Sequence, residues 1–257
     1  MRVALGQRLL GEQRLSLDGR RSCFSCHQPE RGFTDGRAVA APGGLNTPPL
    51  WGLSERQVFG WFSPEMRNLE AMALRPLDDP AEMGPRSEAT LARLRADADL
   101  LAAYRAAFPG ATQAVTWEQT GAALAAALRA IQPPPGAYQR YLAGEATALS
   151  AAALRGQTLF VEVGCATCHR PPDFGSDSFH HIGLPVDPSR NAGRARVPGL
   201  RGVRHTAPYF HDGSAATLEE VVRHYARGGG PGASPAITPL NLTDTDVHNL
   251  VAFLESL

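Results

Sequence analysis

Lysine is absent from this chain of 257 residues: all 25 basic residues are arginine, and they balance 25 acidic residues. A balanced charge gives no reason to expect a nucleic-acid partner. No apolar run approaches the roughly 18 residues that a membrane span requires, so none is predicted. The first residues, MRVALGQRLLGEQ, are too polar for a signal peptide. Segments with the alternating pattern of β-strands are nearly absent, which favours an all-α fold.

Cysteine is scarce as well: there are four, in two Cys-x-x-Cys pairs that are each followed directly by a histidine. Such a run attaches a haem through two thioethers and one imidazole. Two disulfides, a four-cysteine zinc site and redox-active pairs would all leave the two histidines unexplained. Covalent c-type haem is attached outside the cytoplasm, so we expect a periplasmic protein whose signal peptide is not present in this chain. The sequence predicts two c-type haems, on Cys23, Cys26 and His27 and on Cys165, Cys168 and His169.

The two haem motifs lie in segments that resemble each other. LGQRLLGEQRLSLDGRRSCFSCHQP parallels LRGQTLFVEVGCATCHRPP, and each combines an amphipathic helix, the motif and a proline. Helical periodicity also covers 87–108, 116–132, TLEEVVRHYARGGG and LTDTDVHNLVAFLESL, whereas 171–216 is rich in loop residues. Three prolines at 133–135 mark a linker. We predict two tandem cytochrome-c-like domains, 1–145 and 146–257, with long loops around the cofactors.

The first haem has few candidates for its far side. No histidine lies between residues 28 and 168. A methionine ligand would make this haem an electron-transfer site, whereas an open position would admit a small oxidant. The internal methionines are Met66, Met72 and Met83.

The second haem cannot have a methionine ligand from its own domain, because no methionine follows His169. On the helix predicted for TLEEVVRHYARGGG, Tyr225 shares the apolar face of Leu218 and Val222, whereas His224 is turned away by about 100°. An axial ligand and an ordinary core tyrosine both fit this position. The other candidates are His180, His181, His205, His211, His224 and Tyr209.

Several stretches resemble the bacterial dihaem cytochrome c peroxidase and MauG superfamily over nearly the whole chain. They are SCFSCHQPERGFTDG, LNTPPLWG, FGWF with LEAMALRPLDDPAEMG, CATCHRPP, and VPGLRGVRHTAPYFHDGSAATLEEVVRHY. Peroxidases of the family place a methionine ligand fourteen residues after the histidine of YFHDG, and MauG-type enzymes place a tyrosine there. Counted from His211, that position is Tyr225, so the resemblance implies Tyr225 as a ligand of the second haem.

The resemblance also implies roles around both haems. Glu82 matches a glutamate that moves a proton on bound peroxide, and Pro76 a proline that shapes the same pocket. Met72 stands where the family usually has glutamine. Trp61 matches a tryptophan that relays electrons between the haems, although the residues after it differ.

The resemblance further implies a calcium ion between the domains. Its ligands would be Asn46 and the backbone carbonyls of Thr206 and Pro208, an oxygen set that suits a hard cation. His211 would orient groups at the second haem.

The implied function is a MauG-like dihaem oxidase. Hydrogen peroxide would generate a high-valent two-haem state that oxidises a partner protein, with a tryptophan as the target residue. FHHIGL and the His224–Tyr225 pair also resemble MbnH, the MauG-like enzyme of methanobactin clusters. Val163 stands where MauG has an exit tryptophan, which argues against an identical substrate. One alternative is a peroxidase supplied with electrons by a small cytochrome or cupredoxin. Another is a non-catalytic dihaem electron carrier, which the lack of a second ligand for the first haem disfavours.

Overall fold

The structure is a computed structural model that describes residues 1–39, 44–187 and 189–257. The predicted all-α fold is confirmed: in this part of the chain the only strands are β1 (Phe179–His180) and β2 (Ala195–Arg196), which pair antiparallel. Every helix within these ranges is too short or too polar to traverse a lipid bilayer. The α-helices are α1 (Arg2–Leu10), α2 (Leu69–Leu74), α3 (Glu88–Arg95), α4 (Ala98–Ala107), α5 (Trp117–Ala130), α6 (Ala137–Leu142), α7 (Ala151–Glu162), α8 (Cys165–Cys168), α9 (Leu218–Ala226) and α10 (Asp244–Ser256).

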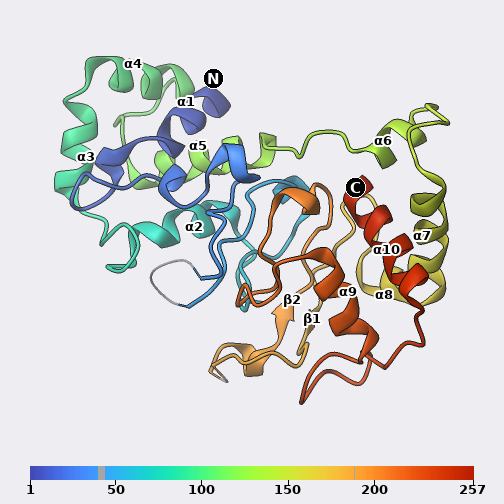
Figure 1. Ribbon diagram of the computed structural model, residues 1–257. Helices are drawn as coiled ribbons and strands as arrows, with labels where there is room; N and C mark the ends of the chain where they lie inside the picture. Colours follow the sequence, from blue (N-terminus) through green and yellow to red (C-terminus); the bar gives the residue numbers. More distant parts are fainter. Residues whose placement is uncertain (40–43, 188) are drawn as a thin grey trace.

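The helices form two groups, each with its own apolar core (Figure 1). Leu9, Leu94 and Leu124 are among the residues that fill the first core, and Phe160 and Phe253 lie in the second. An extended segment joins α5 to α6 across one edge of the molecule (Figure 1). Tyr138 of α6 packs in the second core, although it precedes the boundary predicted after residue 145. That boundary stays a prediction.

One glycine in each half explains the resemblance between the two sequence segments. A Cβ on Gly6 of α1 would overlap the carbonyl oxygen of Ala123 in α5. A Cβ on Gly156 of α7 would overlap the carbonyl oxygen of Asn249 in α10 in the same way. Each half therefore brings two helices into backbone contact at a residue that has no side chain.

Capping side chains mark where several of the predicted helices begin. Thr116, Thr217 and Thr243 each accept a hydrogen bond at the start of α5, α9 and α10. The helix predicted over 87–108 is instead two helices. α3 ends at Arg95. Asp97 then caps the start of α4, because its side chain accepts a 2.7 Å hydrogen bond from the Leu100 backbone N–H.

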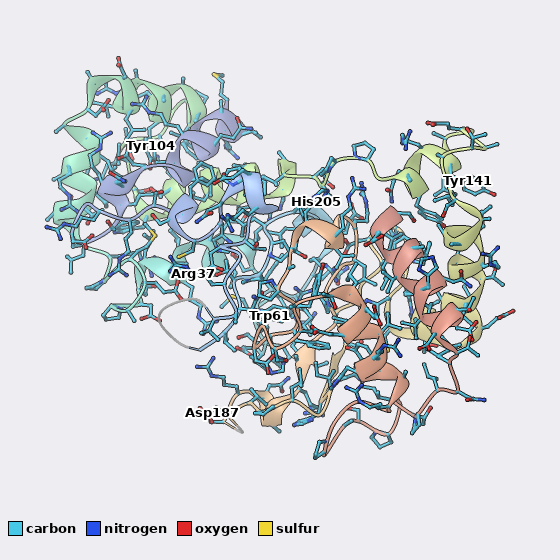
Figure 2. All side chains as sticks on the ribbon, in the orientation of Figure 1. Arg37, Trp61, Tyr104, Tyr141, Asp187 and His205 are labelled. Carbon is cyan, nitrogen blue, oxygen red and sulfur yellow. The ribbon has the colours of Figure 1, made fainter. Side chains whose placement is uncertain are left out.

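A segment of the first half, residues 46–62, lies against loops of the second half. The Asn46 N–H donates to the His211 carbonyl at 2.7 Å, and the Arg196 N–H donates to the Trp61 carbonyl at 2.8 Å. Figure 2 places Trp61 near the middle of the molecule, between the two groups of helices. Backbone hydrogen bonds thus join the two halves at Asn46 and at Trp61 itself.

Candidate haem centres and the interface between them

The two predicted haem motifs have matching local geometry. Cys23 begins the short 3-10 helix η2 (Cys23–Ser25), and Cys165 and Cys168 bound α8. The Nδ1 of His27 lies 3.0 Å from the Phe33 carbonyl oxygen, and the Nδ1 of His169 lies 2.9 Å from that of Phe174. A carbonyl can only accept, so Nδ1 carries the proton in both rings. The Nε2 atoms are then free to bind iron.

The environment of these side chains suits haem ligation. Burial lowers the pKa of His27, and it lowers the pKa of His169 to about 4, which keeps both imidazoles neutral. Burial raises the pKa of Cys23 to about 12 and that of Cys165 to about 11. Redox-active Cys-x-x-Cys pairs need a lowered thiol pKa, so these pairs do not match that class.

The alternatives to haem attachment fail on geometry as well. All four cysteines are free of disulfides. Within the described residues, no three His, Cys, Asp or Glu side chains are grouped to bind a metal ion, which rules out a four-cysteine zinc site there.

A second repeated feature, which the sequence reasoning missed, supports each histidine. The Pro-x-Leu-x-Gly pattern occurs at 48–52 and at 198–202. The Pro48 carbonyl also interacts with His27, and the Pro198 carbonyl with His169. Both patterns end in a glycine with φ of 70°, followed by the 3-10 helices η4 (Leu53–Glu55) and η7 (Val203–His205). A search for short patterns shared by the two halves would have found it.

Tyr225 lies at the second motif, on α9. Burial raises the pKa of its phenol far above the usual range, and the neighbouring Cys165 and Cys168 sulfurs act in the same direction. Its side chain is half-buried in the protein alone. This arrangement brings the phenol close to both cysteines of the second motif.

His224 is buried too, contrary to the expectation that it is turned out of the core. Its Nε2 lies 2.8 Å from the Ile182 carbonyl oxygen, and its ring centroid is 4.9 Å from that of Phe210. The loop before β2 covers this second face of α9, so both faces of the helix are protein-covered.

Of the other candidate ligands of the second haem, only some lie near the second motif. The Nε2 of His180 lies 3.9 Å from the Cys168 sulfur, so His180 is also near the second motif. The Nδ1 of His181 accepts from the Gly183 N–H at 3.0 Å. The His205 ring lies 6.4 Å from Trp51, and the charge that acts on Tyr209 is that of Glu255. Tyr225 and His180 are therefore the side chains placed beside the second pair of cysteines.

Glu82 lies near the first motif, because its charge acts on both Cys23 and Cys26. Partial burial, followed by the charge of Asp79, raises the pKa of the Glu82 carboxyl. By surface area the residue is exposed, so its carboxyl is accessible at the first motif. Arg21 donates hydrogen bonds to the carbonyls of Ala81 and Glu82 and fixes the backbone there.

The other residues named for the first pocket lie around the same loop. Pro76 lies in η5 (Arg75–Leu77), and its carbonyl accepts from the Met83 N–H at 3.1 Å. Met83 is 7% exposed and belongs to the first core, against which Met66 and Met72 also pack.

Trp61 and His211 meet where the two halves join. The Trp61 Nε1–H donates to the Asn46 carbonyl at 3.0 Å, and its ring lies 6.5 Å from that of His211. His211 is 2% exposed, its pKa is lowered by burial, and its Nδ1 has no hydrogen-bond partner. The Phe62 ring lies 5.2 Å away. The indole of Trp61 is thus held at this interface by a hydrogen bond to a backbone carbonyl and by contact with the His211 ring.

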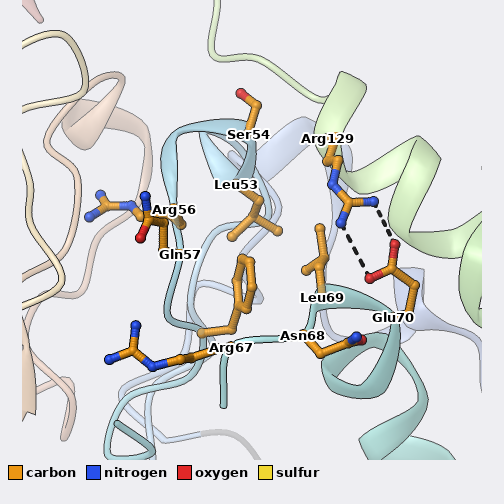
Figure 3. Close-up of a pocket in the computed structure, with 10 residues that line it drawn as sticks. Leu53, Ser54, Arg56, Gln57, Arg67, Asn68, Leu69, Glu70 and Arg129 are labelled. Carbon is orange, nitrogen blue, oxygen red and sulfur yellow. Dashed lines mark hydrogen bonds and ion pairs between the residues drawn. The ribbon is translucent and has the colours of Figure 1, made fainter. Parts of the chain in front are cut away.

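A cavity of about 490 Å³ opens beside η4, the start of α2 and the end of α5 (Figure 3). Arg129 closes one side through an ion pair with Glu70 at 2.8 Å. None of the predicted catalytic or haem-binding residues lines this cavity. The cavity is therefore separate from both motifs.

Comparison with known proteins identifies the family. The model of the di-haem cytochrome c peroxidase family, which includes MauG, matches residues 1–147, and the cytochrome c model matches residues 153–257. The chain belongs to the di-haem cytochrome c peroxidase and MauG family. It carries two c-type haems and is a haem oxidoreductase that acts on peroxide.

Relatives of both kinds match the whole chain. The methylamine utilization protein MauG of Methylorubrum extorquens is 35% identical and is covered over 78% of its length. The cytochrome c peroxidase Ccp of Escherichia coli is 31% identical, and the chain spans 58% of it. The crystal structure of a MauG-like protein associated with microbial copper homeostasis matches with a TM-score of 0.88 and 34% identity, over 100% of this chain and 89% of that one.

Proposed function

We propose that the protein is a MauG-like oxidase that uses hydrogen peroxide to oxidise a partner protein, with a tryptophan side chain as the target class. The observation that carries this proposal is the position of Tyr225 beside Cys165 and Cys168, in a chain with no methionine after residue 83. A phenolate ligand stabilises oxidised iron better than a thioether does. Both oxidising equivalents of peroxide could then be held on the two haems.

In this proposal two c-type haems, held by the predicted cysteines and by His27 and His169, supply the redox chemistry when bound. Glu82 takes a proton from one oxygen of peroxide and returns it to the other, which favours heterolytic cleavage of the bond between them. Its raised pKa brings the carboxyl closer to neutral pH, where such exchange is efficient. Pro76 shapes the wall of this site.

Trp61 is proposed as the electron relay between the halves. Its hydrogen bond to Asn46 and its contact with His211 keep the indole in one orientation. His211 is proposed to support groups at the second haem from this position.

Some of the similar proteins support a MauG-like role, and others support the alternative of a cytochrome c peroxidase. MauG of Methylorubrum extorquens and the copper-associated MauG-like structure, at 35% and 34% identity, support oxidation of a protein. The cytochrome c peroxidases at about 30% identity favour reduction of peroxide by a small cytochrome or cupredoxin. Val163, in place of the exit tryptophan of MauG, indicates that electrons leave the partner by another route.

One experiment separates these functions. The ferric protein is mixed with one equivalent of hydrogen peroxide without a donor, and the irons oxidised beyond the ferric state are counted by Mössbauer spectroscopy. We expect two, in a state that decays slowly. A single oxidised iron together with rapid turnover of a reduced small cytochrome would identify a peroxidase instead. Resting electron paramagnetic resonance (EPR) spectra with two low-spin haems and no high-spin haem would identify an electron carrier.

We also propose one calcium ion between the halves, bound by the Asn46 Oδ1 and the carbonyls of Thr206 and Pro208. Asn46 and Thr206 are 6% and 9% exposed, and the Asn46 amide nitrogen donates to the Arg37 carbonyl at 3.0 Å, which leaves Oδ1 to accept a cation. Removal of calcium with a chelator should lower the melting temperature, and added Ca²⁺ should restore it. We place this protein in the periplasm, where c-type haem is attached.

A further inference from the structure

A group of charged side chains fills the interface between the halves, and it contains more positive than negative charge. Three arginines from both halves approach two aspartates of the loop that follows the second haem motif. We call this group the interface arginine cluster; it consists of Arg56, Arg196, Arg201, Asp173 and Asp177.

Arg56 crosses from the first half into the second. Its side chain is 5% exposed and forms an ion pair with Asp173, which is 11% exposed. The same guanidinium donates to the Ser176 and Val197 carbonyls at 3.3 Å. The Arg56 guanidinium therefore already has an anionic partner and two backbone acceptors within the protein.

The other two arginines, Arg196 and Arg201, form no ion pair of their own within 4 Å among the described residues. Burial, followed by repulsion from Arg56, lowers the pKa of Arg196 to about 10. Its Nε donates to the Gly60 carbonyl at 3.2 Å. The Nε of Arg201 is buried and has no hydrogen-bond partner, while Asp173 feels the charges of all three arginines. Arg196 finds only backbone carbonyls, those of Gly60 and Val197, and the buried Arg201 Nε finds no acceptor. A buried donor without an acceptor is costly, and three arginines face two aspartates, so the cluster has room for a further anion.

The position of the cluster indicates which anion it lacks. The carbonyls of Phe174 and Pro198 interact with His169. Asp173 directly precedes Phe174, and Arg196 and Arg201 lie on either side of Pro198 in the sequence. The Arg196 N–H also bonds to Trp61. The excess positive charge therefore lies beside the loops whose carbonyls act on His169, next to the interface.

We propose that the interface arginine cluster binds a propionate carboxylate of the second haem through Arg196 and Arg201. A guanidinium matches a carboxylate with two parallel hydrogen bonds, and each haem carries two carboxylates. The bound carboxylate neutralises the excess charge between the halves. This inference rests on the presence of two haems and is independent of the proposed oxidation of a partner protein.

Two properties of the second haem follow. Nearby positive charge stabilises the reduced iron, so the arginines raise its reduction potential. They also keep the propionate ionised, because an opposite charge lowers the pKa of a carboxyl group. The other titratable groups facing this site are Asp173, Asp177, Glu55 and His169.

The test replaces each arginine with glutamine, which removes the charge and keeps a hydrogen-bond donor. Arg201→Gln is the cleaner variant, because its Nε gives up no bond within the protein. Arg204→Gln, three residues further along the same loop and exposed, is the matched control. The potentials of both haems are measured by spectroelectrochemistry on the holoprotein from about pH 5 to about pH 8, and covalent haem content and melting temperature are recorded.

We expect Arg201→Gln and Arg196→Gln to lower the reduction equilibrium constant of the second haem at least tenfold, which is 59 mV for a one-electron couple. The potential should also become more pH-dependent, rising as the freed propionate gains a proton in acid. Arg201→Lys should recover most of the shift. If both glutamine variants match the control in potential and in pH dependence, the proposal is wrong. If Arg196→Gln fails to fold, the result for Arg201→Gln decides.

Discussion

The indole N–H of Trp61 donates a 3.0 Å hydrogen bond to the backbone carbonyl of Asn46, whose own N–H bonds to His211 in the other half. The orientation of the proposed relay thus depends on a residue that spans both halves and that is also a proposed calcium ligand. Loss of the indole should therefore affect communication between the haems more than it affects either haem alone.

We expect Trp61→Phe to retain both haems and to slow the sharing of oxidising equivalents between them at least tenfold, or about 1.4 kcal/mol in the barrier. Phenylalanine fills the space but lacks the hydrogen bond and is harder to oxidise. Stopped-flow spectra after mixing with peroxide measure the rate at each haem. Trp117→Phe, at the start of α5 beside Arg86, is the control and should behave as the wild type. Equal rates in the two variants would remove Trp61 from the electron path.

Glu82→Gln should retain the haem spectra and slow the reaction with peroxide by roughly 10²–10⁴. The carboxylate must be ionised to accept the proton of peroxide. The wild-type rate should therefore fall as the pH drops through the raised pKa of Glu82, and the variant should lack this dependence. Pre-steady-state rates across the acid range test both statements. Glu65→Gln, an exposed residue, is the control, and an unchanged rate in Glu82→Gln would assign the proton transfer to another group.

Tyr225→His should keep a six-coordinate, low-spin second haem, because imidazole is also a good ligand. It should nevertheless raise the reduction potential, since a neutral nitrogen replaces an anionic oxygen. The second iron would then no longer be oxidised beyond the ferric state by peroxide. Mössbauer spectra of the treated variant check this, and two highly oxidised irons would contradict the role proposed for Tyr225. Tyr225→Phe should instead give a second high-spin signal in EPR, whereas an unchanged low-spin signal would make His180 the better candidate.

Arg56→Met should destabilise the protein by about 3–5 kcal/mol, because Asp173 then stays buried without its partner. Without Arg56 the pKa of Asp173 rises further above its unfolded value. The variant's deficit is therefore largest above that pKa and shrinks as acid protonates the carboxyl. Thermal unfolding at about pH 8 and about pH 5 measures this change. Arg56→Met combined with Asp173→Asn should recover stability, and a deficit independent of pH would show that the loss is one of packing.

Local chemistry made much of the site predictable. The motif spacing singled out His27 and His169, and the helical periodicity predicted the segments that form α5, α9 and α10. The periodicity of α9 predicted that Tyr225, which is half-buried beside the second motif, faces inward. It could not reveal that a loop also covers the opposite face and accepts a hydrogen bond from His224. A helical pattern registers one apolar stripe, whereas burial by a polar loop leaves no periodic signal.

Contacts between distant segments were less predictable. Nothing in the local sequence indicates that Arg56 pairs with Asp173, or that the carbonyls of Phe33 and Phe174 hold the two histidines. These contacts depend on how loops pack after the two halves have met. The interface charges were missed for the same reason: each arginine resembles a surface residue until its partner segment is known.

The proline-rich segment between α5 and α6 gives the interface a property that two separate chains would lack. Each half has its own pair of contacting helices, its own haem motif and its own core, so the molecule resembles a dimer whose two subunits are joined in one polypeptide. A short tether supplies the second half at an effective concentration of about millimolar, which no longer depends on how much protein is present. The contacts between the halves, from the Trp61 and His211 rings to the ion pair of Arg56 with Asp173, therefore stay formed at any protein concentration. Dilution alone should not separate the two motif sites.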